Sequence, residues 1–457
     1  MLFPKDRRTT PHSRLWLLAV ASMCLSLLGG CGGNASSTGP QYSVGGTVTG
    51  LAMGRQLVLS NSGNQSLTVT ANGAFQFSYP NIAGTPYAVT ISSQPVNQSC
   101  SVANGSGRAN ATVSNIAVTC TASASRYVYA VNAGDSTIAG FTLDSSTGLL
   151  SALSSINGNN ASNTAPSVAV MAPSGNALYV LNPKACCAAS AEVTAFTVDN
   201  ASGTLSFASS VVVGNTATGM AVDGTGSYLY VARYDGAIIS SFAIDTGTGV
   251  FTSVGDASLA FGAAPKGLAA DPSGKFVYSA NSGSDNVTAW RIGTGGVLTS
   301  IGTTPAGASP QAVAVDPSGR FAYSANSGDN TLTAFRINTT TGALTKVANT
   351  TLASAPIALS VAPNGRWLLA TSVAGKSVTV LGINSTTGAL TSINTVTLAG
   401  TPNAVAVDAS NRYAFVTSSS DNALSTLQLD GTSGQLSFAG SVSAGNTPQA
   451  VVVAPGP

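Results

Sequence analysis

Residues that could carry acid–base chemistry are scarce in this chain. Its only histidine is His12 and its only glutamate is Glu192. Histidine is the one side chain whose ordinary pKa lies near neutral pH, so a general base here has to be an aspartate, glutamate or lysine with a strongly shifted pKa. The sequence contains no Ser-His-Asp set, no zinc-ligand cluster and no phosphate-binding glycine loop. We therefore assign no catalytic residue and expect neither a metal nor a cofactor.

Other polar residues stand at matching places in a sequence repeat. The stretch 310–319 reads Pro-Gln-Ala-Val-Ala-Val-Asp-Pro-Ser-Gly, and related stretches follow the same register. The copies begin 45 to 51 residues apart, at Pro166, Ala217, Pro265, Pro310, Pro356, Pro402 and Pro448. A repeat of about 40–50 residues is typical of one four-stranded blade of a β-propeller.

One repeat predicts four short strands, over 312–315, 321–325, 331–337 and 343–347. The first is a short apolar run, and the third alternates polar and apolar residues. Asp316-Pro317-Ser318-Gly319 predicts a turn between the first two strands, and Asp271 is expected to be a turn residue in the same way. Trp290 and Trp367 fall within predicted strands, where we expect them to pack between blades.

The number of repeats predicts how the ring closes. Six inner strands are followed by three more strands, whereas the seventh, 448–453, is followed only by the last residues of the sequence. The propeller region, 122–457, conversely begins with a second strand at 127–132. Joining the two fragments completes one blade and leaves no unpaired ring edge. We predict an all-β protein with a seven-bladed propeller, in keeping with 7% charged residues and 50 glycines.

This architecture gathers a candidate binding face, because inner strands begin and second strands end on the same side of the ring. The face collects Lys266, Gln311, Asn403 and Gln449 near the axis, with Lys184, Glu192 and Arg233 farther out. Lys266 and Gln311 are also consistent with a merely solvated rim. The asparagines at the ends of second strands are expected to initiate turns by bonding nearby backbone; these are Asn132, Asn182, Asn281 and Asn326.

The N-terminal segment predicts export. Basic residues precede an apolar run, 15–28, which is too short to span a bilayer comfortably. The segment ends in Leu28-Gly29-Gly30-Cys31, which resembles the lipobox of bacterial lipoproteins. That resemblance implies a signal peptide over 1–30, acylation of Cys31, and sorting to the outer membrane of the cell envelope. An ordinary signal peptide with an incidental cysteine is the alternative.

Two regions lie between the lipobox and the propeller. Residues 31–41 are small and polar, which predicts a flexible tether. Residues 42–121 predict a small β-sandwich, and the run Gly45-Gly46-Thr47-Val48-Thr49-Gly50-Leu51 resembles transthyretin-like and immunoglobulin-like modules of bacterial surface proteins. The formal net charge is +2, and no basic patch is present, so nucleic acid is not an expected partner.

The cysteines agree with an oxidising compartment. Cys100 and Cys120 lie in the small module, where we predict a disulfide; a metal pair is the alternative, but it lacks histidine and acidic partners. Cys186 and Cys187 are adjacent in a loop of the second blade. Three states are open for this pair: a vicinal disulfide that has a function, a rigid clip of the loop that has no function, or two free thiols.

The repeated strands resemble a known propeller family. Tyr129-Ala130-Val131-Asn132, Tyr278-Ser279-Ala280-Asn281 and Tyr323-Ser324-Ala325-Asn326, with Thr341-Gly342-Ala343-Leu344 later in the period, are similar to lactonase-type seven-bladed propellers, which include 6-phosphogluconolactonases and surface proteins with Tyr-Val-Thr-Asn repeats. Enzymes of that family carry histidine, arginine and glutamate around the central opening. None of the residues that follow the repeat prolines here is histidine.

Three functions remain in view. The first is a non-catalytic, monomeric and lipid-anchored envelope protein whose propeller binds a protein, glycan or small ligand. The second, implied by the resemblance, is a hydrolase of a sugar lactone or similar cyclic ester, which would use Glu192 or an aspartate with Arg233 and Lys266. The third is a metal-assisted hydrolase that uses the asparagines and an aspartate.

Overall fold

The structure is a computed structural model that describes residues 39–95, 98–122, 127–144, 147–158, 165–183 and 190–454. Its elements are β-strands and one 3-10 turn, Thr294–Gly296. Within these ranges no helix is long and apolar enough to cross a bilayer.

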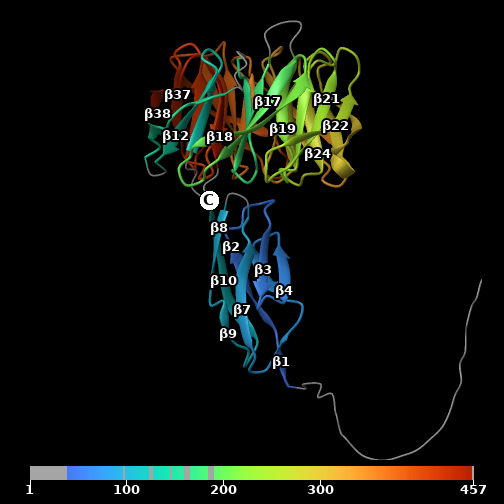
Figure 1. The fold of residues 1–457 in the computed structure, drawn as a ribbon, viewed down its shortest axis with the longest axis vertical. Coiled ribbons are helices and arrows are strands. Elements are labelled where there is room, and N and C mark those ends of the chain that lie inside the picture. The colour runs from blue at the N-terminus through green and yellow to red at the C-terminus, as the bar shows by residue number, and fades with distance from the viewer. Residues whose placement is uncertain are drawn as a thin grey trace, which may run out of the picture. The chain divides into compact units, whose positions relative to one another are not determined.

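The N-terminal module is built from two four-stranded sheets (Figure 1). One sheet has the order β5 (Gly73–Gln76), β2 (Val44–Thr49), β10 (Val113–Ala122), β8 (Gln98–Ala103). The other has the order β4 (Gln65–Val69), β3 (Leu57–Asn61), β7 (Pro86–Ser93), β9 (Ser106–Arg108), and β1 (Gln41–Tyr42) pairs with β6 (Asn81–Ile82). Val48, Leu59 and Val118, from both four-stranded sheets, share one buried core. The predicted sandwich is therefore present, and its transthyretin-like or immunoglobulin-like kinship stays a prediction.

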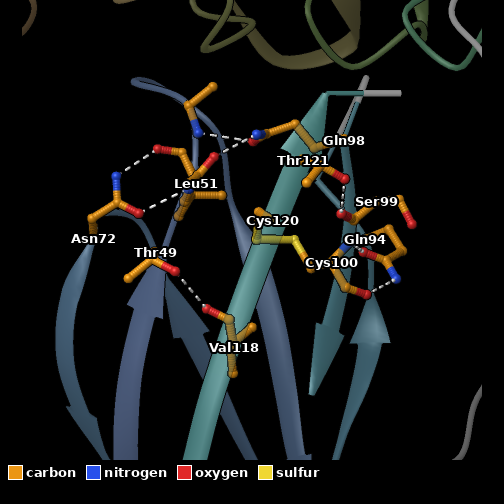
Figure 2. The surroundings of a disulfide bond; sticks show 12 residues. Thr49, Leu51, Asn72, Gln94, Gln98, Ser99, Cys100, Val118, Cys120 and Thr121 are labelled. Carbon is orange, nitrogen blue, oxygen red and sulfur yellow. Dashed lines mark hydrogen bonds between the residues drawn. A yellow bond between two sulfur atoms is a disulfide. The ribbon is translucent and has the colours of Figure 1, made fainter. Parts of the chain in front are cut away.

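A disulfide joins neighbouring strands of this module. Cys100 in β8 lies directly opposite Cys120 in β10, and their sulfur atoms are bonded (Figure 2). Both cysteines are buried in the sandwich core. Just above them, Gln98 bonds the backbone of Gly50 and Ala52 through its amide. The predicted disulfide is confirmed, whereas Cys31, Cys186 and Cys187 lie outside the described residues.

The rest of the described chain forms seven antiparallel sheets, one for each blade (Figure 1). From the inner strand outward, blade 1 consists of β39 (Pro448–Ala454), β11 (Tyr127–Asn132), β12 (Thr137–Leu143) and β13 (Leu150–Ala152) with β14 (Ile156–Asn157). Blade 2 consists of β15 (Val168–Met171), β16 (Ala177–Asn182), β17 (Ala191–Val198) and β18 (Leu205–Gly214). Blade 3 consists of β19 (Ala217–Val222), β20 (Tyr228–Arg233), β21 (Ile238–Ile244) and β22 (Phe251–Ser258).

Blades 4 to 7 repeat the arrangement. They are β23 (Pro265–Ala270), β24 (Phe276–Asn281), β25 (Asn286–Ile292), β26 (Leu298–Pro305); β27 (Pro310–Val315), β28 (Phe321–Asn326), β29 (Thr331–Ile337), β30 (Leu344–Thr351); β31 (Ala358–Val361), β32 (Trp367–Ser372), β33 (Ser377–Ile383), β34 (Leu390–Thr397); and β35 (Pro402–Val407), β36 (Tyr413–Ser418), β37 (Ala423–Leu429), β38 (Leu436–Ser443). The fourth strand of blade 5 begins one residue later than predicted and extends four residues further.

Blade 1 contains the predicted closure. The last strand, β39, pairs antiparallel with β11, and Val452 lies opposite Tyr129. The ring is thus closed by main-chain hydrogen bonds between the two ends of the propeller sequence.

The repeated aspartates fix the turn between the first two strands of a blade. Asp316 is 4% exposed, and its Oδ1 accepts hydrogen bonds from the backbone N–H groups of Arg320 at 2.8 Å and Phe321 at 2.7 Å. Its Oδ2 accepts from the backbone N–H and the hydroxyl of Ser318. Asp271 makes the same set of bonds in blade 4. The prediction that both are turn residues is confirmed.

Neighbouring blades meet through an aromatic ring laid on a glycine. The first residue of the second strand is aromatic in blades 1 and 3 to 7: Tyr127, Tyr228, Phe276, Phe321, Trp367 and Tyr413. Each ring lies against the glycine of the next blade's last turn, as a Cβ placed on Gly342 would stand 2.3 Å from Phe276. These glycines have positive φ, which is 81° at Gly342. The two tryptophans also pack between blades as predicted, Trp290 at 2% and Trp367 at 6% exposure.

Arginines cover several of these rings. Arg366 lies over Trp367 with its Cζ 4.9 Å from the ring centroid, and its guanidinium donates to the carbonyls of Gly431 and Thr432 in blade 7. Arg291 and Arg336 make the same kind of contact with Phe276 and Phe321. The arginines at this end of the blades therefore stabilise the ring, at the opposite end from the candidate face.

Candidate functional site

The candidate site is a ring of side chains at the start of the seven inner strands. In every blade the first position of the repeat is buried and the next one is half-buried. We call these second positions the mouth ring; they are Gln449, Ser167, Thr218, Lys266, Gln311, Ile357 and Asn403. Six of the seven are polar, and none is a carboxylate or an imidazole. Ser167 and Thr218 were not among the predicted site residues, although their place directly after Pro166 and Ala217 in the looser repeats could have identified them.

Two members of the mouth ring form a carboxamide pair where blade 7 meets blade 1. Asn403 Nδ2 donates to the carbonyl of Pro448 at 3.0 Å and to Oε1 of Gln449 at 3.2 Å. Because a carbonyl only accepts, these contacts fix the orientation of both amides. Within the described residues, Asn403 Oδ1 and Gln449 Nε2 have no hydrogen-bond partner. An acceptor and a donor therefore stand side by side for a ligand.

Gln311 and Thr218 are held more firmly. Gln311 Nε2 donates to the carbonyl of Ser309 at 3.3 Å and to its hydroxyl at 3.0 Å. Thr218 Oγ1 donates to the carbonyl of Pro265 at 2.8 Å and so links blade 3 to blade 4. Both side chains have local partners, which leaves them less free than the Asn403–Gln449 pair to change partners for a ligand.

A cationic group adjoins the mouth ring in blades 3 and 4. The ammonium of Lys266 lies 4.6 Å from the centre of the Tyr234 ring, in a cation–π contact. The residue before Tyr234 is Arg233, whose Nη1 is 3.4 Å from Oδ2 of Asp256 on β22. The guanidinium lies close to Gly214, where an added Cβ would stand 2.6 Å from Cζ. Lys266 thus contacts the segment of blade 3 that also carries Arg233.

Arg233 ends the second strand of blade 3, where the second strands of blades 1, 2, 4 and 5 end in asparagine and those of blades 6 and 7 end in Ser372 and Ser418. In blade 5, Asn326 Nδ2 donates to Thr333 on the third strand, and Thr333 donates to Asn349 on the fourth. Asp256 lies opposite Ser240 just as Asn349 lies opposite Thr333, so blade 3 has charges where blade 5 has amides. The Nε of Arg233 is buried without a partner among the described residues.

The expectation that the asparagines initiate turns is wrong. Asn132, Asn182, Asn281 and Asn326 are all 0% exposed. Their amides donate to threonine hydroxyls of the third strand, as between Asn281 and Thr288 at 2.8 Å. The threonines that receive these hydrogen bonds lie on the third strand, which pairs with the strand that the asparagine ends. These asparagines are therefore part of the blade interior.

Glu192, the outer acidic candidate, does not join the mouth ring. Glu192 lies on β17, the third strand of blade 2, opposite Asn182 and Val212. No hydrogen bond connects it to the mouth ring within the described ranges, and Lys184 lies outside them. The described residues contain no cluster of three histidine, cysteine or acidic side chains suited to a metal ion.

Beyond the mouth ring the channel is lined by small aliphatic residues. A cavity of about 370 Å³ lies among the inner strands, with Val170, Met220, Val407 and Val452 on its wall. Ser360 is the one polar side chain along this wall in the described part of the chain. Polar recognition is therefore concentrated at the mouth.

Comparison with known proteins defines the class. The family model for "Lactonase, 7-bladed beta-propeller" matches residues 132–259, 260–361 and 350–453, which is more than half of the chain. This protein belongs to the seven-bladed β-propeller lactonase family.

Solved structures share this fold. The periplasmic gluconolactonase PpgL of Pseudomonas aeruginosa is similar over 73% of this chain and 100% of its own, with a TM-score of 0.63 and 20% identity. A candidate 6-phosphogluconolactonase of Bacteroides fragilis covers 72% of this chain and 98% of its own, with a TM-score of 0.61 and 19% identity. At this identity the likeness establishes the fold alone. No curated protein matches the sequence.

Proposed function

We propose that this protein hydrolyses a sugar lactone, and that the mouth ring binds the substrate. The observation that carries the proposal is a ring of amides, hydroxyls and one ammonium group in a chain of the lactonase family. Amides and hydroxyls are suited to the hydroxyl groups of a sugar, because each can donate and accept hydrogen bonds. The choice of a sugar lactone as substrate class follows the gluconolactonase of Pseudomonas aeruginosa, which this chain resembles in fold.

The residues fit a hydrolytic reaction in which water attacks the lactone carbonyl. The ammonium of Lys266 would stabilise the negative charge that develops on the carbonyl oxygen. A carboxylate of blade 3, Asp235 or Asp256, would accept the proton of the water, and the ring oxygen would leave with that proton. The product would be the open-chain aldonic acid. This assignment favours the aspartates over Glu192 because they belong to blade 3, whose Tyr234 contacts Lys266, whereas Glu192 belongs to blade 2.

The test is hydrolysis of 1,5-aldonolactones by the purified full-length protein, corrected for spontaneous hydrolysis. We expect Lys266→Met to lower kcat/KM by about 100-fold, as the loss of one oxyanion-stabilising group does. Gln311→Met is the matched control, because it removes a polar group from the same ring position in the next blade. Equal rates for the Lys266→Met variant and the unchanged protein would remove Lys266 from the mechanism. Asp235→Asn and Asp256→Asn then identify the base.

A second candidate, ligand binding without turnover, is favoured by one observation: the mouth ring contains no carboxylate or imidazole. In that case aldonolactones and their open-chain acids bind, their affinity falls in the Gln449→Leu variant, and no hydrolysis above the spontaneous rate is measured.

We further propose that the protein is a monomer anchored to the cell envelope through Cys31. The support is the sequence of the N-terminal segment, whose apolar run and terminal Gly30-Cys31 suit acylation. Several acyl chains at about 0.8 kcal/mol per buried CH₂ hold a protein firmly to a bilayer. Incorporation of a labelled fatty acid tests this, and Cys31→Ser should abolish the label while the propeller stays folded.

A further inference from the structure

The contact between blades 2 and 3 lacks the aromatic ring found between the other blades. β16 begins with Ala177, where the second strands of the other blades begin with Tyr, Phe or Trp. The glycine that would receive the ring is still present: Gly249 has a φ of +73°, close to that of Gly203 and Gly434. A Cβ on Gly249 would meet only the methyl carbons of Ala208, at 3.0 Å, and Ala195, at 3.8 Å.

The arginines that cover the ring in blades 4 to 7 are missing as well. Asn176 precedes Ala177, at the position of Arg320 and Arg366 in blades 5 and 6. Thr197 lies across from Ala177, at the position from which Arg336 covers Phe321. Both the ring and its cover have thus been replaced by smaller side chains, and the backbone has not closed over the space.

A cavity of about 510 Å³ occupies this place. Phe196, Ala208 and Tyr179 give it apolar walls, and Asn176, Thr225 and Thr246 give it a polar edge. Ligand pockets of proteins commonly have volumes of about 300–1,000 Å³ and combine an apolar wall with a few polar groups. The cavity is therefore large enough for a ring of the kind that the other blades supply themselves.

The hydroxyl of Tyr179 is left without a partner in this cavity. The equivalent tyrosines of blades 1, 3 and 4 donate to the turn carbonyl of the next blade, as Tyr278 does to Gly342 at 3.1 Å. In blade 5 the equivalent hydroxyl, that of Tyr323, is buried without a partner among the described residues. In blade 3 the carbonyl of Gly249 instead accepts a hydrogen bond from Ser209. Tyr179 is 2% exposed and makes no hydrogen bond within the described residues. Burial raises its pKa to about 12, so it remains a donor at neutral pH.

We propose that the cavity between blades 2 and 3 binds a small monocyclic aromatic compound, whose ring occupies the place of the missing side chain and whose polar substituent accepts a hydrogen bond from Tyr179. A planar ring fits against the bare backbone of Gly249, as Phe276 fits against Gly342. Tyr179 lines the cavity and its hydroxyl has no partner among the described residues, so it can donate to the polar substituent and orient the compound. This site lies at the end of the blades opposite the mouth ring and does not depend on the lactone reaction.

The test uses ligand-observed NMR and calorimetry on the full chain with three probes: acetophenone, ethylbenzene and cyclohexyl methyl ketone. We expect acetophenone to bind, and we expect the non-planar ketone to bind at least tenfold more weakly. Ala177→Phe restores the ring of the other blades and should abolish binding. Ala177→Ser is the matched control that keeps the cavity and should bind as before. Tyr179→Phe should lower the affinity for acetophenone by about three- to tenfold and leave the affinity for ethylbenzene unchanged.

Three results would overturn the inference. Equal affinity of the Ala177→Phe and Ala177→Ser variants would show that the compound binds elsewhere, and circular dichroism of both variants excludes misfolding as the cause. Failure of both aromatic probes to bind the unchanged protein would show that the cavity does not accept a ring. Binding of a phenylalanine-bearing peptide alone would assign the cavity to a protein partner instead.

Discussion

Buried tyrosine hydroxyls make the stability of this protein sensitive to alkaline pH. Burial is the main cause that raises the pKa of Tyr129, Tyr230, Tyr278 and Tyr323 well above the usual value. The folded state therefore holds these protons more tightly than the unfolded state, in which a tyrosine titrates near pH 10. Their contribution to stability is fully present below about pH 10 and is lost as the pH rises further.

We predict that the urea midpoint of the propeller is constant between pH 7 and 9 and falls steeply above about pH 10. Tyr278→Phe removes one of these titrating groups, so its midpoint should fall less steeply over the same range. Parallel curves for this variant and the unchanged protein would show that Tyr278 does not contribute. Unfolding followed by far-ultraviolet circular dichroism at each pH gives the measurement.

We expect the turn aspartates to contribute strongly to the stability of the blades. Asp316→Ala removes the acceptor for the buried N–H of Phe321 and the part-buried N–H of Arg320. It should lower the free energy of unfolding by about 2–4 kcal/mol, because a buried donor then has no acceptor. Asp430→Ala is the comparison: Asp430 caps an exposed turn through Thr432 and Ser433, and water can replace it there. A smaller effect at Asp316 than at Asp430, measured by urea unfolding, would contradict this account.

At the scale of the elements, the aromatic ring on the glycine is the unit that joins blades. Gly342→Ala places a Cβ 2.3 Å from Phe276, whereas Gly295→Ala has no atom within 4 Å. Both glycines have positive φ, 81° and 73°, so both variants carry similar backbone strain. We predict that Gly342→Ala lowers the melting temperature clearly more than Gly295→Ala. Equal losses would mean that strain alone, and not the contact, explains the glycine.

The module disulfide is a separate prediction. Replacing Cys100 and Cys120 by serine should lower the stability of the N-terminal module by about 2–5 kcal/mol. The propeller transition should not change, because the disulfide joins two strands of the module's own sheet. Calorimetry that resolves the two transitions checks this.

The strands and the ring could be predicted because they depend on local, repeated sequence. The second strand at Tyr127, the turn at Asp316 and the closing strand at Pro448 all follow from period and register. Contacts between strands could not be predicted in the same way. The pairing of Arg233 with Asp256 crosses two strands, and the buried asparagines take hydroxyl partners that no turn pattern reveals. The missing aromatic residue at Ala177 can be found by aligning the repeats, because the second strands of all six other blades begin with an aromatic residue.

At the scale of the whole molecule, the ring depends on one strand. Ending the chain after residue 447 removes β39 and exposes the inner edge of β11 and the buried side chains behind it. We predict loss of cooperative unfolding and aggregation, which are hazards of an unpaired edge. Ending the chain after residue 454 is the control, which should stay monomeric by light scattering. A monomeric, cooperatively folding product from the shorter chain would contradict the role of the closure.

The pairing of β39 with β11 also constrains how the protein is made. A ribosome releases β11 early and β39 only after six blades have been synthesised, so the first blade waits incomplete throughout translation. Until then the inner edge of β11 is an unpaired strand edge, which other chains can pair with. A chain that ends before β39 cannot close the ring in this way, because the strand that pairs with β11 is then missing.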